Sequence, residues 1–424
     1  MKFRKVSALL LAGAMCAATV VGCGKTSSSS GAGSNDATKA AEDEEITATI
    51  TVWSPAEDQS VDNGEWLQKM CEKFNDEHPK WNLTFKYGTC SEGDAGKTVS
   101  ADPSASADVY MYANDQTQTL IDAGAIAKLG GSALETVKKN NTEAMLKTVS
   151  IGDDVYGVPF TGNTWFLFYN KDIFTEDDVK NLDTMLAKGK VAFQLTNSWY
   201  IGGFYFGNGC SAFGADGTDE SAGIDLTGDK ATEVTKYLVD LAANPNFVND
   251  ADSAGITGFN DGTVGAFFSG SWDMSNIKLD KSKVGVVAAP TYTLNGEEKQ
   301  IKAFAGSKAI GVNPNCKYPQ VAVALALYLG SDDAQISHYE SRGIIPCNIG
   351  AVANEKVSSD EMANAQNDAM NNKSVMQPTF KGMSNWWTPA ENMGKSIVAG
   401  ETTKDNVADK TAEFNEGANN GVVK

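Results

Sequence analysis

Aromatic side chains with polar neighbours recur along the sequence, and this pairing has the clearest chemical use. The flat face of an indole or phenol ring packs on the apolar C–H face of a sugar, while carboxylate and amide groups bond its hydroxyls. A core position explains most single tryptophans, because large aromatic residues are usually buried. The repeated pairing therefore favours a site for an uncharged sugar. The candidate residues are Glu57, Asp58, Tyr112, Asp115, Gln116, Asn163, Trp165, Asn197, Trp199, Trp272, Trp386 and Trp387.

The charge balance and the rarity of histidine argue against several classes of partner. Acidic residues number 54 against 35 basic ones, and the formal net charge is -19. Such a chain repels phosphate backbones, so we expect no nucleic-acid partner. With His78 and His338 as its only histidines and no C-x-x-C pair, the sequence offers no convincing set of metal ligands. We expect neither a metal nor a cofactor.

Apolar periodicity predicts alternating strands and helices. Residues 46–53 alternate between apolar side chains and threonines, which is the period of a strand with one buried face. Apolar residues at 67, 70, 71 and 74 have helical spacing. A chain of 424 residues with this order predicts two α/β domains, whose ligands bind beyond the carboxyl ends of the strands. Further strands are expected near 83–87, 109–112, 191–195, 264–268, 284–289 and 310–312, and helices near 120–129, 234–241 and 321–329.

Four short segments resemble those of one known family. Residues 108–126 carry a strand, an aromatic residue, an acidic residue and the end of a short helix. The sequence YGVP begins at Tyr156, and YNKD begins at Tyr169. Phe259 opens a segment that ends in GSW at Trp272, and the sequence GIIP follows at 343–346. In this order, over nearly all of the chain from residue 46 to 424, they resemble extracellular solute-binding proteins of bacterial ABC sugar importers, in the maltose/maltodextrin-binding class.

The resemblance implies an α/β fold of the periplasmic-binding-protein type. Two lobes, each with a mostly parallel sheet flanked by helices, would close on a ligand by a hinge. The expected boundaries are 46–160 and 291–342 for the N-lobe, 166–290 and 348–424 for the C-lobe, and 161–165 and 343–347 for the hinge crossings.

The resemblance also implies roles for individual candidates. Two positions that carry glutamates in the family are amides here, and Gln116 stands where the family usually has an arginine. Amides bond hydroxyl groups both as donors and as acceptors, so a sugar site is still expected while the identity of the sugar stays open. The implied contacts are polar ones from Glu57, Asp58, Asp115, Gln116, Asn163 and Asn197, and aromatic ones from Tyr112, Trp199, Trp272 and either Trp386 or Trp387.

Residues 1–23 have the layout of a lipoprotein signal peptide. Three basic residues precede the apolar run 6–21, which is short for a membrane span and ends in VVGC, a resemblance to the bacterial lipobox. Acylated Cys23 would become the mature N-terminus, and 24–45 would form a flexible tether. An ordinary signal peptide with an accidental cysteine is the alternative. We expect an extracytoplasmic protein that is anchored to a bacterial cell membrane only through its N-terminal lipid.

These observations favour a lipid-anchored monomeric receptor that binds an oligosaccharide, with a malto-oligosaccharide as the leading ligand, and delivers it to ABC permease subunits. A glycoside hydrolase is an alternative, because Glu57, Asp58 and Asp115 could supply the two carboxylates that such an enzyme needs. The amides at Asn163 and Asn197 argue against catalysis, since they remove acid–base groups. A surface sugar adhesin without a transporter is the third hypothesis.

Overall fold

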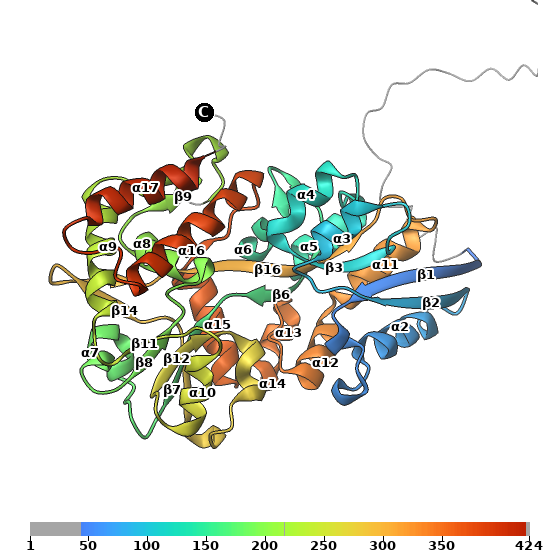
Figure 1. Ribbon diagram of the computed structural model, residues 1–424. Coiled ribbons are helices and arrows are strands. Elements are labelled where there is room, and N and C mark those ends of the chain that lie inside the picture. Colours follow the sequence, from blue (N-terminus) through green and yellow to red (C-terminus); the bar gives the residue numbers. More distant parts are fainter. Residues whose placement is uncertain (1–43, 216, 421–424) are drawn as a thin grey trace, which may run out of the picture. The chain divides into compact units, whose positions relative to one another are not determined.

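The computed structural model describes residues 44–215 and 217–420, which belong to one compact unit. The predicted signal peptide, Cys23 and nearly all of the predicted tether lie outside the described residues. None of the helices in the described ranges is long and apolar enough to cross a membrane. The described chain forms two lobes, each with its own sheet and hydrophobic core (Figure 1).

The N-lobe is built on a sheet with the strand order β17-β16-β3-β1-β2, in which β6 also pairs with β16. Strands β2 and β3 are parallel to β1, whereas β16 is antiparallel to β3 and β6. The sheet is mixed because β16 enters it from the opposite direction, after the chain has passed through the C-lobe. The strands are β1 Ile46–Ser54, β2 Trp81–Thr89, β3 Val109–Ala113, β6 Val158–Asn163, β16 Ala303–Val312 and β17 Ser374–Met376.

The sequence pattern accounts for the N-lobe core. The alternating apolar residues of β1 are buried, and the threonines between them are less so. The predicted helix near residue 70 is α2 (Trp66–Asp76), which buries Leu67, Cys71 and Phe74 at the expected spacing. The other helices of this lobe are α3 Ala95–Ala101, α4 Thr117–Asp122, α5 Gly131–Asn140, α6 Glu143–Thr148, α11 Pro319–Leu329 and α12 Asp332–Arg342.

The C-lobe sheet has the order β11-β8-β12-β7-β13. Strand β8 is parallel to β11 and β12, whereas β7 is antiparallel to β12 and β13. Its strands are β7 Phe166–Asn170, β8 Val191–Phe193, β11 Phe247–Asn249, β12 Ala266–Ser269 and β13 Val284–Val287. Its helices are α7 Leu182–Leu186, α8 Ser198–Gly207, α9 Gly228–Ala242, α10 Ala254–Asp261, α15 Glu361–Asn372, α16 Ser384–Val398 and α17 Val407–Asn419.

Neighbouring chain segments join the lobes. Strand β6 leads directly into β7, and β16 runs antiparallel beside β6 near the middle of Figure 1. An isolated bridge pairs Thr161 with Pro346. The segments 161–165 and 343–347, predicted as hinge crossings, therefore lie side by side at the junction of the lobes.

The hairpin of β14 (Thr291–Leu294) and β15 (Glu297–Gln300) packs on a different lobe from the one expected. Residues 291–342 were assigned to the N-lobe, but Tyr292 is buried in the C-lobe core and its hydroxyl donates to the Phe204 carbonyl at 2.7 Å. The chain reaches the N-lobe sheet only with β16, because the apolar face of the hairpin packs on the C-lobe first. Trp386 and Trp387 lie in helix α16.

Candidate functional site

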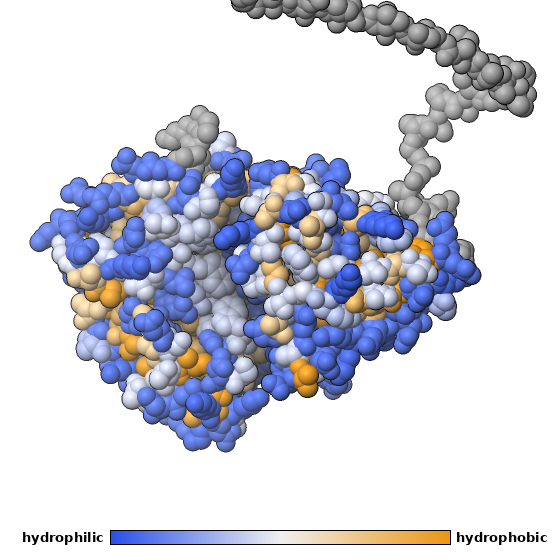
Figure 2. Space-filling view, turned by 45° about the vertical axis from the view of Figure 1, so that its right-hand side comes forward, coloured by the Kyte–Doolittle hydropathy of each residue, from blue (hydrophilic) through white to orange (hydrophobic). Residues whose placement is uncertain are grey.

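A cavity of about 230 Å³ lies between the two lobes, and we call it the interlobe cleft. The molecular surface is also visibly hollowed between the lobes in Figure 2. Both lobes and both hinge crossings line the cleft, so its position agrees with the predicted ligand site. Its lining residues are Pro55, Glu57, Ser91, Glu92, Thr161, Gly162, Asn163, Ser271, Trp272, Lys308, His338, Arg342 and Ile344.

The N-lobe wall begins directly after β1, where a short 3-10 helix, η1 (Ala56–Asp58), carries two of the predicted residues. The Glu57 side chain is exposed and lines the cleft. Asp58 is 1% exposed, and its Oδ1 accepts from His338 Nε2 at 2.9 Å and from an Arg342 guanidinium nitrogen at 2.5 Å. Asp58 therefore supports the wall from behind and holds the arginine that lines it.

The protonation of Asp58 follows from these contacts. Burial by itself raises the pKa of this carboxyl, but the hydrogen bond and charge of His338, together with those of Arg342, outweigh burial and hold the pKa below the ordinary value of 3.8. Asp58 is therefore ionised at neutral pH, and its charge is balanced by that of Arg342.

A second ion pair completes the N-lobe wall. Glu92 follows β2 and is largely buried, and its Oε2 lies 3.3 Å from Nζ of Lys308 on β16. Lys308 pairs in register with Thr161 on β6, so its strand runs along the hinge side of the cleft. Apart from the exposed carboxylate of Glu57, the charges of this wall are paired within the protein, so the wall favours a neutral ligand with hydroxyl groups over an ion.

The C-lobe wall carries aromatic rings. Trp272 follows β12 on the 3-10 helix η6 (Ser271–Asn276), and 40% of its surface is exposed. Trp199 follows β8 on α8, whose first turn is capped by the Asn197 side chain. The two indole rings have centroids 6.0 Å apart and planes inclined by 41°. The exposed face of Trp272 gives the cleft an apolar platform opposite the paired charges.

Three predicted aromatic residues occupy the lobe cores. Tyr112, Trp165 and Trp386 have no exposed surface. Trp165 stacks on Tyr200 at 5.1 Å, and the indole N–H of Trp386 donates to the Ser198 carbonyl at 2.9 Å. Their rings have no free face for a sugar, because Tyr112 on β3, Trp386 on α16 and Trp165 in the connection between β6 and β7 all pack into the cores.

The remaining candidates lie at the edges of this arrangement. Trp387 is partly buried against the C-lobe core. The Gln116 amide bonds the backbone of Gly93 and Gly96 and so holds the loop before α3. Burial raises the pKa of Asp115, whose Oδ1 is enclosed without a hydrogen-bond partner among the described residues. An enclosed oxygen of this kind is usually satisfied by water or a ligand.

The structure therefore brings together Glu57, Asn163 and Trp272 in the cleft lining, with Trp199 against Trp272. Sequence reasoning missed Glu92, Lys308 and the role of His338. Glu92 comes shortly after the second predicted strand, and this position could have predicted that it lies at the ligand site. Lys308 had no such signal, because its position depends on the pairing of β16 with β6 across the hinge.

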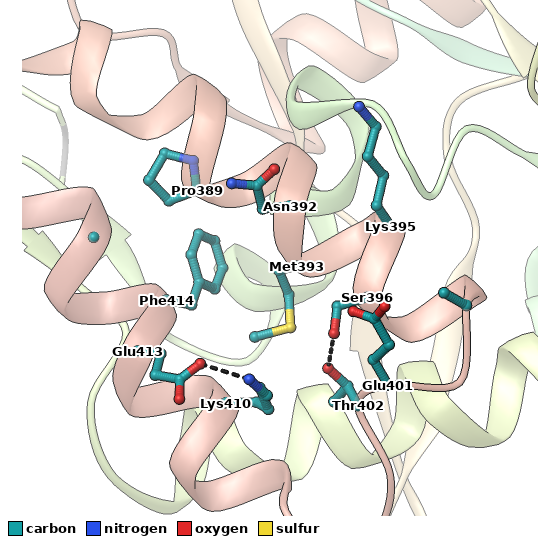
Figure 3. Close-up of a pocket in the computed structure, with 12 residues that line it drawn as sticks. Pro389, Asn392, Met393, Lys395, Ser396, Glu401, Thr402, Lys410, Glu413 and Phe414 are labelled. Carbon is teal, nitrogen blue, oxygen red and sulfur yellow. Dashed lines mark hydrogen bonds and ion pairs between the residues drawn. The ribbon is translucent and has the colours of Figure 1, made fainter.

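A larger hollow of about 490 Å³ lies between α16 and α17 (Figure 3). Pro389 and Met393 line it, and Lys410 Nζ is bonded to Glu413 Oε2 at 2.8 Å. Its aromatic residue, Phe414, is only 3% exposed, so this hollow has no free ring face for stacking. No group of three or more metal-ligating side chains occurs within the described part of the chain.

Comparisons with known proteins agree on one family of binding proteins. A family model described as a bacterial extracellular solute-binding protein matches residues 69–365. Maltodextrin-binding protein MdxE of Bacillus subtilis (strain 168) is 27% identical over 291 residues, which is 62% of this chain and 68% of that protein. The galactooligosaccharide-binding protein of the same organism is 24% identical over 333 residues, 73% of this chain and 76% of that protein.

Solved structures share the fold. A structure described as being with acarbose is 49% identical, has a TM-score of 0.84, and covers 89% of this chain and 100% of its own. Maltodextrin binding protein MalE1 from L. casei BL23, without ligand, is 25% identical with a TM-score of 0.81, and covers 88% of this chain and 99% of its own. These similarities confirm the predicted α/β fold of the periplasmic-binding-protein type.

Proposed function

Because this chain belongs to the family of bacterial extracellular solute-binding proteins, we propose that it is a receptor that binds a malto-oligosaccharide in the interlobe cleft. The observation that carries the proposal is the exposed ring of Trp272, which lines the cleft together with Glu57, Glu92 and Arg342 and has Trp199 packed against it. Stacked rings recognise the C–H faces of glucose units, and the polar wall bonds their hydroxyls. The family consists of binding proteins, so the hydrolase hypothesis is not pursued.

The relatives support this class of ligand. MdxE is named for maltodextrin, and the structure that is 49% identical is described with acarbose, an oligosaccharide. The galactooligosaccharide-binding relative makes galacto-oligosaccharides a second candidate class of ligand. A ligand panel must therefore include both malto-oligosaccharides and galacto-oligosaccharides.

Calorimetric titration tests the ligand. Maltotriose and maltopentaose are expected to bind the wild-type protein with saturable heats, and a galacto-oligosaccharide and xylotriose are expected to bind at least about tenfold more weakly. Tighter binding of the galacto-oligosaccharide would reassign the ligand class. The absence of binding by every member of the panel would contradict the sugar-receptor proposal.

We further propose delivery to an ABC importer, by closure of the lobes on the sugar and recognition of the closed form by the permease. Membrane vesicles that contain the permease should accumulate radiolabelled maltotriose only when this protein is added. Binding without any dependence of uptake on the protein would favour the adhesin hypothesis.

The lipid anchor on Cys23 is a separate proposal, which rests on the lipobox-like sequence and the apolar run before it. Cells that express the full chain should incorporate labelled palmitate into the protein and retain it in the membrane fraction. A Cys23→Ser variant should lose the label and be released. Unchanged labelling of that variant would contradict the assignment.

A further inference from the structure

The indole N–H of Trp199 is not bonded within its own helix. It donates to Oε1 of Gln377 at 2.9 Å, a residue 178 positions away in the sequence. Since the centroid of the same ring lies 6.0 Å from that of Trp272, the ring is fixed on one side by an aromatic contact and at its edge by a hydrogen bond. These two contacts define the orientation of the ring.

Gln377 is itself held firmly. It directly follows β17, is 5% exposed, and its backbone N–H donates to the Ala305 carbonyl on β16 at 2.8 Å. Its backbone carbonyl accepts from Asn114 Nδ2 at 3.5 Å, and Asn114 Oδ1 accepts from the Ser307 N–H at 3.0 Å. Asn114 follows β3, so this chain of contacts joins Trp199 in the C-lobe to the sheet of the N-lobe.

A glycine makes room for this arrangement. A side-chain carbon on Gly306 would lie 2.5 Å from Asn114 Oδ1 and 3.5 Å from Gln377 Oε1. Gly306 pairs with Asn163, which lines the cleft. The amides of Asn114 and Gln377 therefore lie against β16 at Gly306, where this strand pairs with β6 at the junction of the lobes.

We propose that Gln377 is a positioning residue, which sets the orientation of the Trp199 ring for sugar stacking and couples that ring to the hinge strand β16. The proposal rests on the proposed sugar-binding function. Gln377 acts through Trp199 and not by contact with the sugar. Without its acceptor, the partly buried indole N–H would lose its partner and the ring would be released to other orientations.

The first test needs no ligand. In nitrogen-15 NMR spectra, the indole N–H signal of Trp199 is identified by its loss in Trp199→Phe. We expect this proton to exchange slowly with solvent in the wild type and in Gln377→Glu, which keeps an acceptor oxygen, and at least about tenfold faster in Gln377→Met, which keeps the size but not the acceptor. Equal exchange in all three proteins would overturn the proposal.

The second test is a double-mutant cycle with maltotriose as the probe. Gln377→Met should weaken affinity about tenfold in the wild-type background and less than twofold in the Trp199→Phe background, where no indole N–H remains. Gln377→Glu should restore most of the loss. An equal loss in both backgrounds would make Gln377 a general structural residue and overturn the proposal.

A matched control separates stability from positioning. Asn181 is a buried amide of the C-lobe, and its Nδ2 donates to Thr291 at 3.1 Å, away from the residues that line the cleft. Asn181→Ala should lower the melting temperature without a change in maltotriose affinity. If the wild-type protein fails to bind maltotriose, the proposed function fails, whereas the exchange measurement still decides the role of Gln377.

Discussion

The rings of Trp199 and Trp272 lie 6.0 Å apart between centroids, although 73 residues separate them in the sequence. They meet because β8 and β12 are adjacent parallel strands, and each tryptophan follows the carboxyl end of one of them. Residues after neighbouring parallel strands are placed at the same edge of the sheet. The sheet topology therefore places Trp199 against Trp272, the ring that lines the cleft.

Replacement of Trp272 by alanine should weaken maltotriose affinity about tenfold or more, since a stacked aromatic platform contributes about 1–2 kcal/mol. The free energy of unfolding should change little, because the ring is already 40% exposed. Val398→Ala, at a site that is 42% exposed on α16, is a matched control that should leave affinity unchanged. Equal affinities of the Trp272 variant and the wild type would remove this ring from the site.

Trp386→Ala should act mainly on stability. The side chain is fully buried among C-lobe residues, so its removal should lower the free energy of unfolding by about 3–5 kcal/mol. Urea denaturation monitored by circular dichroism measures this change. Unchanged stability together with lost sugar binding would instead place this ring against the ligand.

Asp58 should make stability depend on pH in a defined direction. Its pKa is lower in the folded chain than in the unfolded one, so its contribution is fully present above about pH 4 and is lost as the pH falls through the folded pKa. Asp58→Asn should lower the free energy of unfolding by about 3 kcal/mol near neutral pH, because it leaves His338 and Arg342 without their carboxylate.

The measurement is urea denaturation of both proteins over a series of pH values. The difference between them should shrink below about pH 4. A difference that is constant down to about pH 2 would show that the charge of Asp58 is not what stabilises the wall.

Affinity for the sugar should be insensitive to salt. The proposed ligand is neutral, and in the N-lobe wall Glu92 is paired with Lys308 and Asp58 with Arg342, which leaves Glu57 as the exposed carboxylate. The dissociation constant for maltotriose should therefore change less than about twofold between roughly 50 and 500 mM sodium chloride. A tenfold change would indicate a charged ligand.

Local sequence patterns predicted much of the fold, because periodic burial is encoded within each element. The alternation in β1 and the apolar spacing in α2 correspond to the observed burial. The hairpin with Tyr292 was assigned to the wrong lobe, because its partner surface is formed by residues far away in the sequence. Lobe membership is a property of tertiary packing.

The candidate site was predictable only in part, for the same reason. Trp272 and Trp386 look alike in the sequence, but one is exposed at a strand end and the other is buried in a helix. Gln377 carries no local signal, since its role depends on the 2.9 Å bond to a distant indole. Side-chain direction and long-range pairing, and not residue type, separate the cleft residues from the core.

The structure of the protein with maltotriose bound tests the central claim most directly. The account predicts that the sugar lies between the lobes, with a glucose ring packed on the indole of Trp272 and hydroxyl groups bonded to polar residues of the opposite wall. A sugar bound outside the interlobe cleft, or within it without contact to Trp272 or Trp199, would contradict the account.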